Sequence, residues 1–84
     1  MSIRVLYFAG LREALGSPGE EMSLVHGVDT VGALREHIAA RGEPWQQLLR
    51  SRNLRAAVNQ KMAGFEAPIG DGDEVAFFPP VTGG

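Results

Sequence analysis

Cysteine is absent from the 84-residue sequence, and this absence removes several classes of functional site at once. Disulfide bridges, iron–sulfur clusters, thiolate zinc sites and cysteine nucleophiles all require the thiol side chain. A chain without cysteine also fits a reducing compartment, so we expect a cytoplasmic protein. Long apolar runs are lacking as well, and those present are far too short to span a bilayer or to form a secretion signal. We therefore expect a soluble protein that makes no membrane contact.

Basic charge is scarce. Eight lysine and arginine residues stand against ten aspartate and glutamate residues, which gives a net charge of −2. This balance argues against a protein that binds nucleic acid by neutralising phosphates. The hydrophobic fraction of 44% and the charged fraction of 21% are ordinary for a globular protein. A chain of this length has room for one domain with one core.

Residue types that carry catalysis or bind metals are few and scattered. His26 and His37 are the only histidines, and neither lies in a metal-ligand pattern. Asp71 and Asp73 resemble the start of a calcium loop, but the glutamate that closes such a loop is missing, so we expect a glycine-rich turn. Lys61 is the only lysine, and we expect it in a solvated turn. We expect no metal and no cofactor bound by this chain.

The order of apolar and turn residues predicts an α+β domain. The main helix is expected to begin at a cap provided by Asp29 or Thr30 and to end at Gly42. Its core-facing apolar stripe is expected to consist of Val31, Leu34 and Ile38. Shorter helical pieces are expected over residues 11–15 and 44–49, and strands over residues 3–8, 21–25, 54–59, 62–65 and 74–78.

One main helix between strands suggests a mixed sheet that packs on that helix. A right-handed crossover would bring the N-terminal strand beside the later ones. A β-grasp, ubiquitin-like arrangement fits this order and length, and a ferredoxin-like split βαβ arrangement competes with it.

Alternation along the first and last strands assigns their side chains to two faces of the sheet. One set is expected in the core against the helix, and consists of Val5, Tyr7, Val75 and Phe77. The opposite set faces outward and includes Leu6, Phe8 and Phe78. Apolar side chains exposed together are typical of a protein interface. The alternative is that other parts of the chain cover both faces, but 84 residues with one good helix leave little chain for that purpose.

Residues 75–84 contain no charged side chain. Pro79 and Pro80 cannot donate hydrogen bonds to a strand, so sheet pairing should stop there and the rest should extend from the domain. Gly83 and Gly84 lack Cβ atoms, which lets the backbone enter a narrow slot. We therefore expect a β-grasp domain over residues 1–78 and a flexible tail over residues 79–84, with the carboxyl group of Gly84 as the reactive group. A frayed end without function is the alternative.

Residues 71–84 (DGDEVAFFPPVTGG), supported by residues 57–60 (AVNQ) and 5–13 (VLYFAGLRE), carry a resemblance to a known family. The chain resembles the small, sulfur-carrier subunits of molybdopterin synthase, which are members of the ubiquitin-like β-grasp group. The resemblance covers the whole chain in length and order. It is specific in the tail and looser over residues 16–52.

The resemblance implies that Gly84 carries sulfur in molybdenum cofactor biosynthesis. An adenylating enzyme would use ATP to form a glycyl adenylate on Gly84, and a persulfide sulfur would displace AMP to leave a thiocarboxylate. The large subunit of the synthase would then receive the tail and pass the sulfur to a pterin precursor. This chain would be the sulfur-donating subunit of a sulfurtransferase and would not be catalytic alone. The implied contacts are the tail residues Pro79, Pro80, Val81, Thr82 and Gly83, the docking residues Leu6, Phe8 and Phe78, and Arg12 at the rim.

Three other functions stay open. A ubiquitin-like modifier would be joined to a partner lysine through Gly84. The sulfur carrier of the thiamine pathway shares the terminal glycines, although the Phe-Phe-Pro-Pro-Val-Thr stretch speaks against it. In a simple binding module the Gly-Gly end would be incidental.

Overall fold

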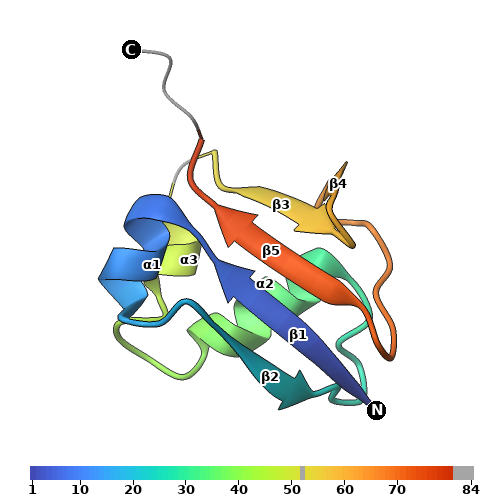
Figure 1. Ribbon diagram of the computed structural model, residues 1–84. Coiled ribbons are helices and arrows are strands. Elements are labelled where there is room, and N and C mark those ends of the chain that lie inside the picture. The colour runs from blue at the N-terminus through green and yellow to red at the C-terminus, as the bar shows by residue number, and fades with distance from the viewer. Residues whose placement is uncertain (52, 81–84) are drawn as a thin grey trace.

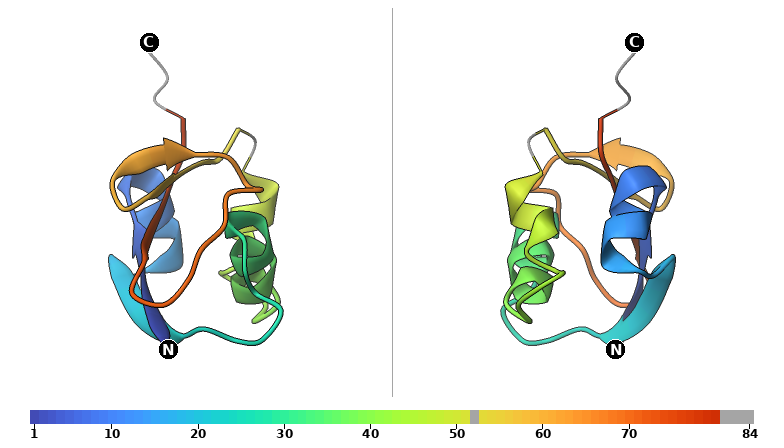
Figure 2. Two further views of the ribbon diagram at one scale, coloured as in Figure 1. Left: turned by 90° about the vertical axis from the view of Figure 1, so that its right-hand side faces the viewer. Right: turned by 90° about the vertical axis from the view of Figure 1, so that its left-hand side faces the viewer.

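A five-stranded mixed sheet forms one layer of the molecule, and α2 and α3 lie in a second layer behind it (Figures 1 and 2). The computed structural model describes residues 1–51 and 53–80. Along the chain the elements are β1 (Ser2–Tyr7), α1 (Ala9–Leu15), β2 (Gly19–Ser23), α2 (Val31–Ala39), α3 (Gln47–Arg50), β3 (Arg55–Val58), β4 (Lys61–Ala63) and β5 (Glu74–Phe78). In this part of the chain, none of the helices has both the length and the apolar character that a membrane span requires.

The first and last strands lie side by side at the centre of the sheet. The strand order is β2-β1-β5-β3-β4, in which β1 and β5 are parallel and the other neighbours are antiparallel. The β1–β5 register aligns Val5 with Val75 and Tyr7 with Phe77. This parallel pair confirms the predicted crossover, and the sheet order confirms the β-grasp fold over the split βαβ alternative.

The core lies between the sheet and α2. The expected core side chains Val5, Tyr7, Val75 and Phe77 all have 0% of their surface exposed. The alternation predicted for β1 and β5 is therefore confirmed. From α2, the predicted stripe of Val31, Leu34 and Ile38 is buried against them.

The start of α2 is fixed by three hydrogen bonds. The Thr30 hydroxyl accepts the N–H of Ala33 at 3.1 Å, so Thr30 is the cap, and Asp29 is not. The N–H groups of Val31 and Gly32 donate to carbonyl oxygens of the segment that follows β4, Ala67 at 3.0 Å and Phe65 at 2.7 Å. The helix begins where predicted because its free N–H groups have partners there.

Element ends differ from the prediction by a few residues. The helix α2 ends at Ala39, before the predicted Gly42, because its final turn tightens into bonds between residues three apart. Similar tight turns occupy residues 44–46, so α3 begins at Gln47. The β3–β4 turn lies at residues 59–60 and not at 60–61. The strand β2 starts at Gly19, two residues earlier than predicted, because its pairing with β1 begins there.

The turn before β5 is tied to both neighbouring strands. Asp73 accepts the N–H of Gly70 at 2.7 Å and the side-chain amide of Asn59 at 3.0 Å. The bond from Asn59, and then that from Gly70, hold the pKa of Asp73 below its usual range. Asp71 accepts the N–H of Ser2 at 2.8 Å. Both carboxylates therefore hold a structural turn, as predicted, and the described residues contain no cluster of side chains that could bind a metal ion.

Candidate functional site: the outer sheet face and the root of the tail

The sheet face opposite α2, called the outer face below, carries an apolar row across four strands. The register aligns Leu6 of β1 with Ala76 of β5, Ala76 with Ala57 of β3, and Ala57 with Met62 of β4. Met62 ends this row and is 65% exposed. Sequence reasoning did not place Met62 on this face, because the assignment depends on where the β3–β4 turn falls.

A second row lies one step nearer the end of β5 and contains both candidate docking phenylalanines. Phe8 directly follows β1, and its N–H donates to the carbonyl oxygen of Phe77 at 3.2 Å. Its side chain is 45% exposed. Phe78 aligns with Arg55 of β3 and is partly buried, as Leu6 is. The structure thus places these phenylalanines at the same end of β1 and β5, with Phe8 the more accessible.

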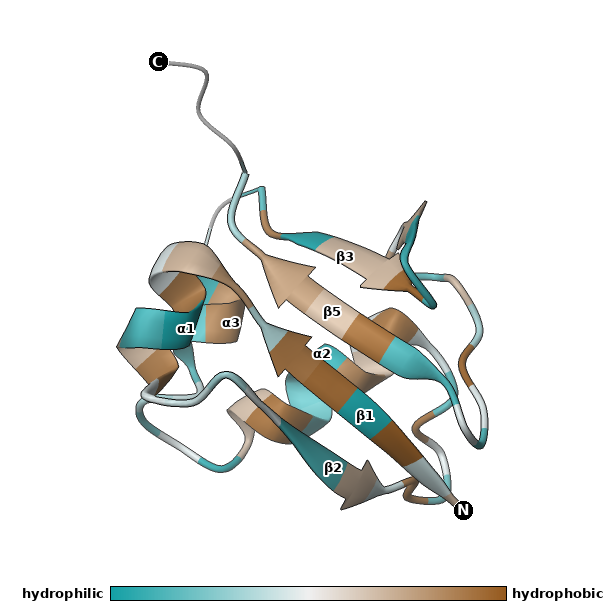
Figure 3. Cartoon of the chain, viewed as in Figure 1, coloured by the Kyte–Doolittle hydropathy of each residue, from teal (hydrophilic) through white to brown (hydrophobic). Residues whose placement is uncertain are grey.

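These two rows form one surface, which we call the apolar half of the outer face. Colouring by hydropathy shows the apolar residues towards the α1 end of the sheet, whereas β2 and the beginning of β5 are hydrophilic (Figure 3). Within residues 1–51 and 53–80, α2 and α3 both lie behind the sheet and leave this face uncovered by them (Figure 2). The surface consists of Leu6, Phe8, Ala57, Met62, Ala76 and Phe78.

The root of the tail lies beside α1 and α3. Pro79 and Pro80 follow β5 and are partly buried. Pro79 lines a hollow of about 210 Å³ with residues of α1 and α3, among them Gly10, Ala14 and Arg50. The chain therefore leaves the sheet at Pro79, directly after Phe78 of the apolar half of the outer face. The other predicted tail residues, Val81, Thr82, Gly83 and Gly84, lie outside the described residues.

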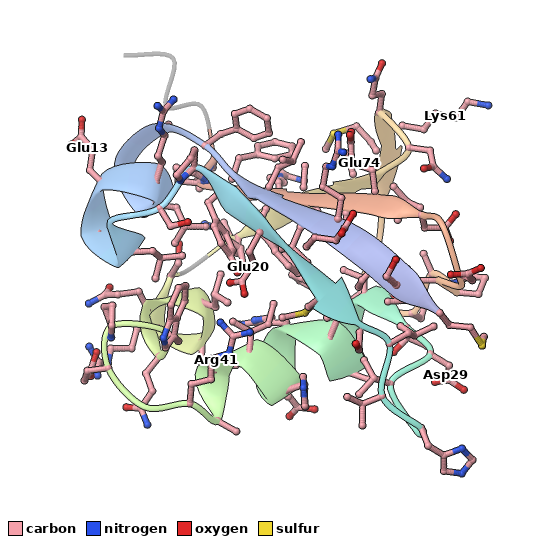
Figure 4. All side chains as sticks on the ribbon, turned by 60° about the horizontal axis from the view of Figure 1, so that its bottom comes forward. Glu13, Glu20, Asp29, Arg41, Lys61 and Glu74 are labelled. Carbon is pink, nitrogen blue, oxygen red and sulfur yellow. The ribbon has the colours of Figure 1, made fainter. Side chains whose placement is uncertain are left out.

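Behind the sheet, polar side chains form hydrogen bonds at Tyr7, the last residue of β1 before Phe8. The Tyr7 hydroxyl donates to Glu20 of β2 at 3.0 Å, and Arg41 donates to the same carboxylate from two nitrogens. Figure 4 shows Glu20 and Arg41 pointing towards each other. Burial of Tyr7, and then the negative charge of Glu20, raise the pKa of the hydroxyl, while the bonds from Arg41 lower the pKa of Glu20. Tyr7 therefore stays neutral at physiological pH. Its hydroxyl is held by Glu20, and its backbone N–H donates to the carbonyl oxygen of Pro18 at 3.0 Å.

The other residues singled out from the sequence lie apart from this surface or on its border. Arg12 is exposed on α1. His26 and His37 are also exposed, as expected for surface histidines. Lys61 points away from the domain near the tip of the β3–β4 hairpin (Figure 4). The described residues thus offer an apolar surface beside the tail root, and no cluster of side chains that could bind a metal ion.

Comparisons with known proteins agree with this arrangement. Residues 5–84 match the ThiS family. The sequence is 50% identical over 82 residues to a molybdopterin synthase sulfur carrier subunit of Escherichia coli (strain K12), and the match covers 98% of this chain and 99% of that protein.

Two solved structures share the fold. The first is the small archaeal modifier protein 1 of Haloferax volcanii, with a TM-score of 0.74, 27% identity and coverage of 95% of this chain and 98% of that one. The second belongs to a complex of subunits 1 and 2 of molybdopterin-converting factor from Helicobacter pylori, with a TM-score of 0.68, 21% identity and full coverage of both chains. The sequence relationship decides the family: the chain belongs to the ThiS family and, within it, to the molybdopterin synthase sulfur carrier subunits.

Proposed function

We propose that Gly84 is the sulfur-carrying residue of this sulfur carrier subunit in molybdenum cofactor biosynthesis. The observation that carries the proposal is the family match, which runs through Gly84 itself. The Gly83-Gly84 pair lacks side chains, so the carbonyl carbon of Gly84 is open to attack and can enter a narrow site. The described domain supplies no competing nucleophile of the cysteine type, since the chain has no cysteine.

The chemistry proceeds in three steps. A carboxylate oxygen of Gly84 attacks the α-phosphorus of ATP on an adenylating enzyme, pyrophosphate leaves, and a glycyl adenylate forms. The terminal sulfur of a persulfide then attacks the carbonyl carbon and AMP leaves. Cleavage of the sulfur–sulfur bond by a thiol leaves the thiocarboxylate, which is an anionic sulfur nucleophile at neutral pH. ATP belongs to the activating enzyme, and this chain binds no cofactor of its own.

The partner that receives the loaded tail is the large subunit of molybdopterin synthase. The Helicobacter pylori relative was solved as a complex of subunits 1 and 2, which supports a heteromer here. The apolar half of the outer face docks on the large subunit, with Leu6, Phe8 and Phe78 among its contacts, and Arg12 lies at the rim. The arm of Pro79, Pro80, Val81, Thr82 and Gly83 then enters the pocket in which the pterin precursor is bound. The cytoplasmic location expected from the lack of cysteine stays a prediction.

The decisive measurement is the intact mass of the chain after incubation with ATP, the adenylating enzyme and a sulfur source. Replacing one oxygen with sulfur should add about 16 Da. Deletion of Gly84, or a tag fused after it, should abolish this gain and leave the melting temperature unchanged. Normal thiocarboxylate formation in the tagged protein would contradict the assignment of Gly84. Higher-mass conjugates without the 16 Da species would favour the modifier function instead.

Gly83 provides a second test of the arm. Gly83→Ala adds one methyl group, which should slow sulfur transfer to the large subunit if the slot admits only backbone. The melting temperature should not change, because the substitution lies beyond the core elements. A melting temperature that falls while turnover stays normal would assign Gly83 to the fold.

A further inference from the structure

The outer face has a second, charged half at the opposite end of β1. The register aligns Arg4 with Glu21 of β2 on one side and with Glu74 of β5 on the other. The three side chains therefore form a row of alternating charge across the sheet. Figure 3 colours most of β2 and the beginning of β5 as hydrophilic.

The three charged side chains of this row do not pair with one another. Within residues 1–51 and 53–80, the side chains of Arg4, Glu21 and Glu74 take part in no hydrogen bond and no ion pair, although cross-strand neighbours of opposite charge commonly pair. Instead they surround an open hollow of about 300 Å³ that Ser2 and Gly72 also line. Arg4 and Glu21 are exposed, and Glu74 is partly exposed. Both carboxylates are thus available to groups outside the chain.

The charge of the outer face changes sign along β1. The charged row carries two carboxylates and one guanidinium, and the exposed Asp71 lies at the same end, where it accepts the N–H of Ser2. The row beside the tail root instead contains Arg55, aligned with Phe78. Arg4 and Phe8 are four residue steps apart, a distance of about 13 Å along an extended strand. A partner that covers the apolar half therefore also faces a net negative row at a defined distance from the tail.

We propose that Glu21 and Glu74 face basic side chains of the large subunit, and that this charged row steers the association of the two proteins. The inference rests on the proposed function and extends it, because it assigns lysine or arginine side chains to the partner surface about 13 Å from the part that covers Phe8. Charged groups at the border of an interface act chiefly on the association rate and on its salt dependence. The apolar half supplies the contact area, and the charged row supplies orientation during the encounter.

The test is stopped-flow association of the full chain with the large subunit at several salt concentrations. Glu21→Lys and Glu74→Lys should each lower the association rate constant about ten-fold at low ionic strength, and the difference from wild type should shrink as salt is added. The matched control is Glu36→Lys, which makes the same charge change on an exposed position of α2, behind the sheet. It should leave the rate within about two-fold of wild type. The melting temperature of Glu36→Lys should match wild type, and those of Glu21→Lys and Glu74→Lys should fall by a few degrees at most, because each of these places a lysine opposite the exposed Arg4.

Two results would overturn the inference. One is wild-type association by both outer-face variants, and the other is an equal loss in Glu36→Lys, which would mean that net charge alone matters. Phe8→Ala separates this failure from failure of the proposed function. If Phe8→Ala weakens binding while the charge variants do not, the docking face is correct and the charged row has no part in it. If Phe8→Ala also binds normally, the outer face is not the docking surface.

Discussion

Arg41 holds Glu20 with two parallel hydrogen bonds. Its two terminal nitrogens donate to the two carboxylate oxygens at 2.9 Å each, and its guanidinium lies 4.9 Å from the ring centre of Trp45. Arg41 lies just beyond α2, and Glu20 lies on the edge strand β2, so the pair joins the helix layer to one edge of the sheet. The Tyr7 hydroxyl donates to the same carboxylate. Paired bonds of this geometry are among the stronger polar contacts in proteins.

Glu20→Gln should lower the free energy of unfolding by about 1 kcal/mol at pH 7. The amide keeps the size of the side chain but loses the charge that Arg41 pairs with. The side chains of Arg41 and Glu20 are 34% and 25% exposed, and solvent screening keeps the effect modest. Urea denaturation of both proteins measures it. The control is Glu21→Gln, whose side chain makes no bond within the described residues and should stay within about 0.5 kcal/mol of wild type.

The same pair predicts how stability depends on pH. Hydrogen bonds from Arg41 lower the pKa of Glu20 in the folded state, so the folded protein holds this carboxylate ionised more readily than the unfolded chain does. The stabilisation is therefore fully present above the unfolded pKa, about 4.3, and is lost as the pH falls through the lowered folded value. The gap between wild type and Glu20→Gln should be constant near neutral pH and close in acid. A gap that widened in acid would contradict this assignment.

The fold could be predicted largely from periodic patterns. Alternation in β1 and β5 identifies the core correctly, because one face of each strand is buried against α2. The stripe in α2 and the cap at Thr30 are likewise local signals. Strand ends were less accurate, because pairing with a neighbour decides them and the neighbour is distant in sequence. Gly19 shows this, since it joins β2 only through its alignment with Leu6.

The candidate site was only partly predictable. Leu6, Phe8 and Phe78 follow from alternation, and the structure places them on the outer face as expected. Met62 joins the same surface through three successive pairings across four strands, and its place depends on the turn at Asn59 and Gln60. The sequence of one strand alone does not determine its register with the next strand. A shift of one residue would move each side chain to the other face, so Met62 could not be placed from its own strand.

The turn between β3 and β4 offers a stabilising substitution. Asn59 and Gln60 both have positive φ values, 51° and 70°. Two-residue hairpin turns of this kind favour Asn followed by Gly, because a side chain at the second position is strained there. Gln60→Gly should therefore raise the free energy of unfolding by about 0.5–1 kcal/mol. Asn59→Ala is the opposite control: it should destabilise, since the Asn59 side chain also bonds Asp73 and the N–H of Glu74.

Arg35 joins α2 to two other segments. Its Nε donates to the carbonyl oxygen of Leu48 in α3 at 2.9 Å, and its guanidinium lies 4.7 Å from the ring centre of Phe65. Arg35→Ala should lower the free energy of unfolding by about 1.5–3 kcal/mol, because it removes a charged hydrogen bond and a cation–π contact together. Arg35→Lys should recover less than half of this loss, since an ammonium group cannot stack flat on the ring while it donates. Equal stability of the Lys variant and wild type would show that charge alone suffices.

Adjacent phenylalanines on β5 give the sharpest contrast between folding and binding. Phe77 has 0% exposure in the core, so Phe77→Ala should lower the free energy of unfolding by about 3–5 kcal/mol. Phe78 points to the outer face and is partly exposed, so Phe78→Ala should cost the isolated domain less than half as much. Burying a phenylalanine against a partner is worth about 1.5–3 kcal/mol in transfer terms.

Phe78→Ala should therefore weaken binding to the large subunit by about ten- to a hundred-fold, as titration calorimetry at 25 °C would measure. Thermal melts of the two variants on their own provide the comparison, because a loss of affinity caused by unfolding would appear in both readouts. The result that contradicts the docking face is a Phe78→Ala protein that melts early yet binds with unchanged affinity. At a saturating concentration of the adenylating enzyme, Phe78→Ala should form the thiocarboxylate at Gly84 at the wild-type rate. The reason is that the chemistry needs the tail, whereas the docking face sets only affinity.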